Sequence, residues 1–245
     1  MEMVVEHKPS YALGIVRMSA GESVRAETGA MVSMTSSVQV QSNMQGGFLK
    51  SAMRSVLGGE SFFVNTFTAV GGPGEVTFAP TLPGDIQPLS LQGGDVFVQS
   101  GSYLAGESSV DVDLKWGGAR TFFSSEGLFL LRLSGQGQVL VSSYGAVHRV
   151  ALDGRGSYIV DTGHVVAFDS RLNWQVRKVS GLVTSLISGE GLVCEFSGEG
   201  ELWLQTRSSQ AFLSWLLPRL PTASASSGGR GGVAGGILGN ILRGE

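Results

Sequence analysis

Apolar and polar residues alternate with a period of two along short segments of the chain. Residues Val110–Trp116 read Val-Asp-Val-Asp-Leu-Lys-Trp, and Trp174–Arg177 continues the same pattern. A period of two places one set of side chains against a core and the other in water, which is typical of a half-buried antiparallel strand. The pattern therefore favours a β sandwich or barrel over a parallel sheet enclosed by helices.

A Gly-x-Gly sequence followed by alternating apolar residues occurs three times. The copies begin at Gly72, Gly135 and Gly198, so that each step from 72 to 135 and from 135 to 198 is 63 residues. An apolar run precedes each copy, which gives the order strand, glycine, strand. We interpret each copy as a β-hairpin whose glycine supplies positive φ, and we expect the three turns to occupy equivalent positions.

A second motif is interleaved with the first and ends in a hydroxyl residue followed by glycine. Its copies are Val24-x-Ala26-x-Thr28-Gly29, Val96-x-Val98-x-Ser100-Gly101 and Tyr158-x-Val160-x-Thr162-Gly163. Ser or Thr before glycine favours a tight turn, and we expect at least two of these glycines to adopt positive φ. The two motifs together predict three β repeats, at residues 1–83, 84–146 and 147–207.

Two segments show helical periodicity instead. One is an insertion at 46–58 in the first repeat, and its apolar face is our candidate interaction face: Phe48, Leu49, Met53, Val56 and Leu57. Three turns form no stable helix alone in water, so we expect this face to be buried against the β body, a second subunit or a membrane. Between a second subunit and a membrane we prefer the subunit, because the cations Lys50 and Arg54 attract a membrane only weakly.

The C-terminal part of the chain differs in composition from the repeats. Capping residues precede a helical pattern at 208–218, and Pro218 provides its stop signal. The Gly- and Ser-rich tail at 219–245 is expected to be a flexible linker.

Composition and charge narrow the class of protein. Glycine contributes 37 of 245 residues, charged residues are 15%, and the formal net charge is −3. This charge balance argues against nucleic-acid binding, because the protein as a whole does not attract a phosphate backbone. The single cysteine, Cys194, alternates with apolar residues and is predicted to be a buried thiol. Without a recognisable signal peptide or membrane span, we expect a cytoplasmic protein.

The residues that most often carry chemistry are sparse. The three histidines, His7, His148 and His164, form no His-x-His pair, and we expect no metal site. His164 falls at a position that differs between the repeats, which favours a solvated turn. Phosphate-binding and nucleophile-elbow motifs are absent from the sequence, and the carboxylates Asp111 and Asp113 are expected on a wet strand face. We therefore predict no catalytic residues, no cofactor and no enzymatic activity.

Several longer motifs resemble a known family. They are Gly21-Glu22, Gly29-Ala30-Met31-Val32, Gly59-Glu60-Ser61-Phe62-Phe63, Gly101-Ser102-Tyr103-Leu104 and Asp161-x-Gly163-His164-Val165-Val166-Ala167. Together they resemble the mitochondrial biogenesis family named for altered inheritance of mitochondria. The resemblance covers about residues 14–206. It implies an all-β fold like that of the tryptophan RNA-binding attenuation protein (TRAP-like), with three antiparallel β-sandwich units of the double-stranded β-helix type around a pseudo-threefold axis and two short helices. It implies no known reaction.

Two classes of function stay open. The first is a non-enzymatic, homo-oligomeric β scaffold or interaction module that meets a protein partner or a membrane surface. The alternative is a module that binds a small ligand or RNA in clefts between repeats. A scaffold should expose an apolar interface, whereas a ligand module should show polar groups that converge in a cleft.

Overall fold

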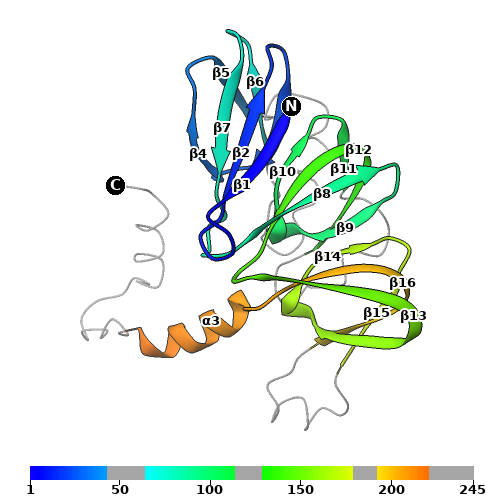
Figure 1. Cartoon of the computed structure of the whole chain (residues 1–245). Coiled ribbons are helices and arrows are strands. Elements are labelled where there is room, and N and C mark those ends of the chain that lie inside the picture. Colours follow the sequence, from blue (N-terminus) through cyan, green and yellow to red (C-terminus); the bar gives the residue numbers. More distant parts are fainter. Residues whose placement is uncertain (43–63, 114–128, 179–191, 221–245) are drawn as a thin grey trace, which may run out of the picture. The chain divides into compact units, whose positions relative to one another are not determined.

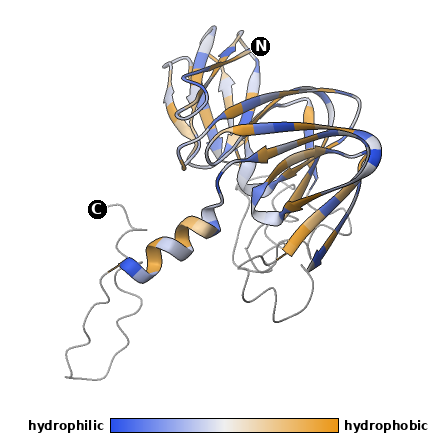
Figure 2. Ribbon diagram, turned by 60° about the horizontal axis from the view of Figure 1, so that its bottom comes forward, coloured by the Kyte–Doolittle hydropathy of each residue, from blue (hydrophilic) through white to orange (hydrophobic). Residues whose placement is uncertain are grey.

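A computed structural model describes residues 1–42, 64–113, 129–178 and 192–220 of the chain. These residues form an all-β body of antiparallel sheets with one short α-helix near its end (Figure 1). The predicted all-β class is confirmed. Apolar and polar residues alternate in short bands along the strands (Figure 2), because successive side chains of a strand point to opposite faces.

The N-terminal part of the body contains seven strands. They are β1 (Glu2–Glu6), β2 (Leu13–Met18), β3 (Ser23–Glu27), β4 (Met31–Met34), β5 (Val38–Ser42), β6 (Val64–Ala69) and β7 (Gly74–Phe78). One sheet has the order β1-β2-β7-β4, and the hairpin partner of β6 is β5, with β3 on its other side.

The middle part is organised around one long strand. Its elements are β8 (Ile86–Gln92), β9 (Val96–Gln99), a 3₁₀ turn at Ser100–Ser102, β10 (Tyr103–Glu107), β11 (Val110–Asp113) and β12 (Leu130–Ser142). The first half of β12 pairs with β9 and β11, and its second half pairs with β8 and β10.

The last part is likewise organised around one long strand. Its elements are β13 (Val147–Asp161), a 3₁₀ turn at Thr162–His164, β14 (Val165–Asp169), β15 (Asn173–Lys178) and β16 (Leu192–Gln205). β16 pairs with β13 along most of its length, with β15 through its first half and with β14 through its second half. The described residues of the two strictly alternating segments, 110–116 and 174–177, thus lie in β11 and β15.

The Gly-x-Gly sequences do not all form hairpin turns, and this part of the prediction is wrong. Gly72 precedes β7 in a turn, but Gly135 and Gly198 lie inside β12 and β16. Both have positive φ, +101° and +98°. Glycine tolerates this conformation within a strand, so each long strand changes direction there and continues to a new partner strand without a turn.

The expectation for the glycines of the second motif is also wrong. Gly29 has φ of +90°, whereas Gly101 and Gly163 are not among the residues with positive φ. Both lie in 3₁₀ turns, which use ordinary negative φ values. In the second of these turns, the Gly163 N–H donates to Asp161 Oδ1 at 2.9 Å.

A β-bulge occurs at the same place in three strands. The pairing shifts between Met31 and Ser33 opposite β7, between Tyr103 and Ala105 opposite β12, and between Val165 and Ala167 opposite β16. Two of these bulged strands, β10 and β14, also pair on their other edge with a strand from the preceding part of the chain, β3 and β9 respectively.

The core consists of three apolar clusters that cross the boundaries between the parts. The first contains Leu104 and Leu140 beside residues of β2, β3, β6 and β7. The second joins Val166 and Trp203 to residues of β8, β9 and β12. The third surrounds Phe168, whose ring lies 5.0 Å from that of Phe196 and 5.3 Å from that of Phe97, centroid to centroid.

The predicted insertion helix at 46–58 and most of the tail at 219–245 lie outside the described residues. In the range expected for the second helix, α3 spans Ser209–Leu216 and a 3₁₀ turn follows at Leu217–Arg219. The chain divides into a compact unit at 1–212 and a second at 213–245. Within the described parts, no helix has the length and apolar character needed to cross a membrane.

Candidate functional site

The residues chosen from the sequence do not come together in a described site. The candidate interaction face of Phe48, Leu49, Met53, Val56 and Leu57 lies outside the described residues. Over the ranges that are described, no group of three or more His, Cys, Asp or Glu side chains is arranged to hold a metal ion. Of the two strand carboxylates, Asp111 is exposed and Asp113 half-buried.

The histidines occupy three separate environments. His7 is largely exposed, with Nε2 3.9 Å from a carboxylate oxygen of Glu6, and His148 is exposed on β13. His164 was expected on a solvated turn but is half-buried, with Nδ1 2.7 Å from the carbonyl oxygen of Gln205. Its place is therefore structural, since the imidazole ties the 3₁₀ turn before β14 to the end of β16.

Two buried titratable groups have raised pKa values. Burial raises the pKa of the Cys194 thiol to about 12, and it also raises the pKa of the Tyr103 hydroxyl. Because the thiolate is the nucleophilic form, Cys194 is an inert core residue, as the sequence predicted. Burial also raises the pKa of Glu27, at the end of β3, to about 7.

A cleft of about 330 Å³ lies between the middle and last parts of the β body. One wall comes from β8 and β9, and the other comes from β13, β14, β16 and Arg171, two residues after the end of β14. The lining residues are Gln87, Pro88, Leu89, Ser90, Val96, Arg149, Asp169, Arg171, Glu201 and Trp203. No motif in the sequence singled out this set, because its members come from five separate segments.

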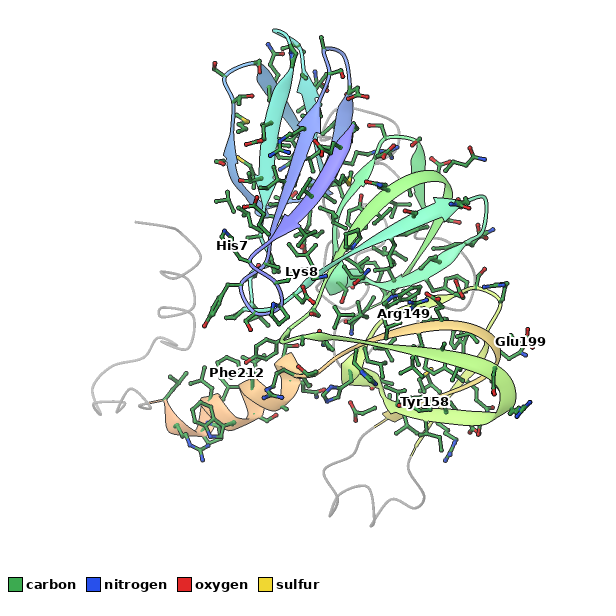
Figure 3. The ribbon with its side chains drawn as sticks, in the orientation of Figure 1. His7, Lys8, Arg149, Tyr158, Glu199 and Phe212 are labelled. Atoms are coloured by element: carbon green, nitrogen blue, oxygen red, sulfur yellow. The ribbon has the colours of Figure 1, made fainter. Side chains whose placement is uncertain are left out.

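The charges in the cleft are already paired. Arg149, labelled in Figure 3, donates two hydrogen bonds to the Glu201 carboxylate, one of them 3.0 Å from Nε to Oε2. Asp169 Oδ2 accepts from Arg171 Nη2 at 3.0 Å and from the Glu201 backbone N–H at 2.7 Å. The cleft thus offers hydrogen-bonding groups without an unbalanced charge.

A second candidate is a surface at the edge of β4, which we call the β4 edge: Met31, Val32, Ser33 and Met34. All four residues are exposed, and the three apolar ones have exposed fractions of 42% for Met31, 58% for Val32 and 43% for Met34. Among the described strands, β4 pairs only with β7. Exposed apolar side chains on an unpaired strand edge favour pairing with another strand.

The far end of β13 presents a similar surface, which we call the β13 edge: residues 157–161. Tyr158, labelled in Figure 3, is 38% exposed and Ile159 is 51% exposed. Among the described strands, β13 pairs only with β16. The sequence held a signal for both edges, since Met31-Val32 and Tyr158-x-Val160 belong to the quoted motifs, but nothing in one sequence distinguishes a covered copy from an open one.

The comparisons with known proteins agree with the family resemblance. An uncharacterised protein of Streptococcus pyogenes serotype M6 is 30% identical over 232 residues, which cover 91% of this chain and 93% of the relative. A crystal structure of a Streptococcus pyogenes protein is similar with a TM-score of 0.74 and 28% identity, over 89% of this chain and 99% of that chain. The family described as mitochondrial biogenesis AIM24 matches residues 3–207. The chain therefore belongs to the mitochondrial biogenesis AIM24 family.

Proposed function

We propose that this protein is a non-enzymatic, homo-oligomeric β scaffold. The observation that carries the proposal is the pair of open strand edges, at β4 and at the end of β13, with apolar side chains up to 58% exposed. A strand edge of this kind is a template for pairing with another chain, and a natural protein rarely leaves one uncovered. An exposed apolar interface was the feature expected of a scaffold.

The scaffold in this proposal is built from three related, TRAP-like units. Three correspondences support it: the bulges of β4, β10 and β14, the spacing of 63 residues between Gly72, Gly135 and Gly198, and the shared pairing scheme of β12 and β16. One further detail is repeated. The Glu75 N–H donates to Thr35 Oγ1 at 3.1 Å, as the Glu201 N–H donates to Asp169 Oδ2 at 2.7 Å.

The absence of a reaction in this proposal rests on where reactive groups lie. The one thiol is buried with a raised pKa, and His164 is held by a backbone carbonyl. The charged groups of the cleft neutralise one another. None of these arrangements activates a nucleophile or separates an acid from a base. We place the protein in the cytoplasm, where a free thiol stays reduced.

Native mass spectrometry of freshly purified protein tests the proposal. We expect a defined mass of two or more chains with no additional retained compound. A single-chain mass at micromolar concentration and moderate salt would contradict the scaffold.

The cleft supports a second candidate function, the binding of a small polar ligand. The favouring observation is that backbone and side-chain polar groups converge beside the buried Trp203, which is 6% exposed. In this case the native mass would exceed the chain mass by a fixed amount, and Arg149→Gln would lose that excess while remaining folded. Arg177→Gln is the matched control, because Arg177 pairs with Glu195 on β15 and β16 outside the cleft.

A further inference from the structure

We propose that the β4 edge of one chain pairs antiparallel with the β13 edge of a second copy, head to tail, with Met34 opposite Ile159. This inference rests on the proposed function, because it names the partner and the contact of the scaffold. The chain itself contains two contacts of the same kind, and these fix the register of the third.

The two internal contacts join a bulged strand to the strand edge of the preceding unit. In the first, Ala105, Gly106 and Glu107 of β10 face Ala26, Arg25 and Val24 of β3. In the second, Ala167, Phe168 and Asp169 of β14 face Val98, Phe97 and Val96 of β9. Both pairs are antiparallel, and in both the bulge lies immediately before the paired residues.

β4 has the features of β10 and β14 on its paired side. Ser33 and Met34 face Thr77 and Val76 of β7, as Ala105 and Gly106 face Leu140 and Val139 of β12. Each step from 76 to 139 and from 139 to 202 is again 63 residues, and Phe168 faces Leu202. Met34 therefore occupies the place of Phe168.

The β13 edge has the features of β9 in the same way. Tyr158, Ile159 and Val160 face Phe196, Glu195 and Cys194 of β16. Val96, Phe97 and Val98 of β9 face Leu133, Arg132 and Leu131 of β12, at positions 63 residues earlier. Ile159 therefore occupies the place of Phe97.

The register of the missing contact follows from these correspondences. Phe168 and Phe97 are opposite each other, with ring centroids 5.3 Å apart. Met34 and Ile159 take their places, and both are apolar and exposed, by 43% and 51%. Opposed apolar residues on antiparallel strands stabilise the pairing, so the two edges match in chemistry as well as in register.

The exposed fractions of the bulged residues show which contact the β4 edge lacks. Leu104 and Val166, the bulged residues of β10 and β14, are 0% exposed because each joins the apolar cluster of the preceding strands. Val32 is the bulged residue of β4, and it is 58% exposed. Among the described residues no preceding unit covers β4, and the last unit of another copy has the edge that fits.

The occupant is a second copy because the two open edges differ from each other. Within the described residues, β4 and β13 each lack a partner on one side, and they do not pair with one another. Unlike surfaces on one chain that complement each other give head-to-tail contacts, and repeated contacts of this kind close into a ring when the rotation allows it. We therefore expect a cyclic assembly rather than a dimer formed by two β4 strands.

Charge substitutions at the two edges test the contact. We expect Met34→Glu alone and Ile159→Lys alone to shift the mass measured by light scattering to one chain, with unchanged circular dichroism. Val70→Glu is the matched control, because Val70 is 53% exposed and lies on neither edge, and its mass should equal that of the natural protein.

Mixing the two variants separates this contact from its alternatives. The unchanged β4 of the Ile159→Lys chain can meet the unchanged β13 of the Met34→Glu chain, so an equimolar mixture should regain a species of two or more chains. An assembly lost in Met34→Glu but intact in Ile159→Lys would overturn the pairing in favour of a β4–β4 contact. Full-size assemblies in both variants would also overturn it while leaving the scaffold proposal intact, whereas a monomeric natural protein would reject both.

A cross-link keeps the inference falsifiable if the charged variants fail to fold. Met34→Cys and Ile159→Cys are prepared separately, mixed and oxidised, with the buried Cys194 left in place. We expect a disulfide-linked product of two chains from the mixture and none from either variant alone. A third variant carries both Met34→Cys and Ile159→Cys in one chain. A disulfide that forms within this chain, and never between chains, would overturn the second copy as the occupant.

Discussion

The pKa of the Glu27 carboxyl group measures how strongly the end of β3 is shielded from water. Burial raises its pKa from 4.5 to about 7, and one pKa unit corresponds to about 1.4 kcal/mol. The shift sets an upper value of about 3 kcal/mol for the free-energy cost of ionising Glu27 in the folded state. Since the side chain is only half-buried, we expect about 2 kcal/mol.

The direction of the pH dependence follows from the sign of the shift. The folded-state pKa lies above the unfolded-state value, so the folded protein holds this proton more tightly. The stability contribution of the neutral carboxyl is present below pH 4.5 and is lost as pH rises to about 7. Glu27→Gln should therefore raise the free energy of unfolding by about 2 kcal/mol at pH 8, and by little at pH 4.

Urea unfolding followed by tryptophan fluorescence at fixed protein concentration measures this difference. The matched control is Glu195→Gln, because hydrogen bonds from Ser157 and Arg177 lower the pKa of Glu195. A lowered pKa gives the opposite sign, so the control should destabilise the protein at pH 8 and lose its effect toward acid pH. Equal changes for Glu27→Gln at pH 5 and pH 8 would refute the reasoning.

Three further predictions concern other parts of the structure and are checked by urea unfolding or thiol labelling. Gly135→Ala should destabilise the protein by about 3 kcal/mol and Gly198→Ala by about 1–2 kcal/mol, because both glycines have positive φ. The loss is larger at Gly135 because a Cβ there would lie 2.6 Å from the backbone oxygen of Ser109. Equal losses for the two substitutions would contradict this difference. Phe168→Ala should cost about 3–5 kcal/mol through the loss of its ring contacts, and a loss below 1 kcal/mol would show a loosely packed cluster. Cys194 should resist a thiol reagent at pH 8 until urea unfolds the chain, and labelling in the native state would contradict its burial.

Periodicity was sufficient to predict the strands but not their connection. The alternation at Val110–Trp116 and Trp174–Arg177 identified β11 and β15, and the apolar neighbours of Cys194 identified a buried strand position. The Gly-x-Gly spacing located equivalent residues, yet Gly135 and Gly198 turned out to be kinks within long strands. Glycine with positive φ serves a turn and a kink equally well, so sequence alone does not separate the two.

The candidate sites depended on tertiary pairing that no local pattern contains. The cleft brings Gln87 together with Arg149 and Glu201, residues more than 60 and 110 positions away. The β4 edge could not be predicted from the sequence for a different reason. Its sequence, Met-Val-Ser-Met, has the apolar character of β10 and β14, and only the structure shows that a strand covers those two whereas no described strand covers β4.

The sharing of core clusters across the three parts has a consequence for synthesis on the ribosome. Leu104 and Leu140 complete the cluster of the N-terminal strands, and Val166 and Trp203 complete that of the middle strands. Because the chain emerges from its N-terminus, each group of strands leaves the ribosome before the residues that cover it. We expect nascent chains that stop before Leu140 to expose apolar surface and to bind chaperones, and longer ones to release them.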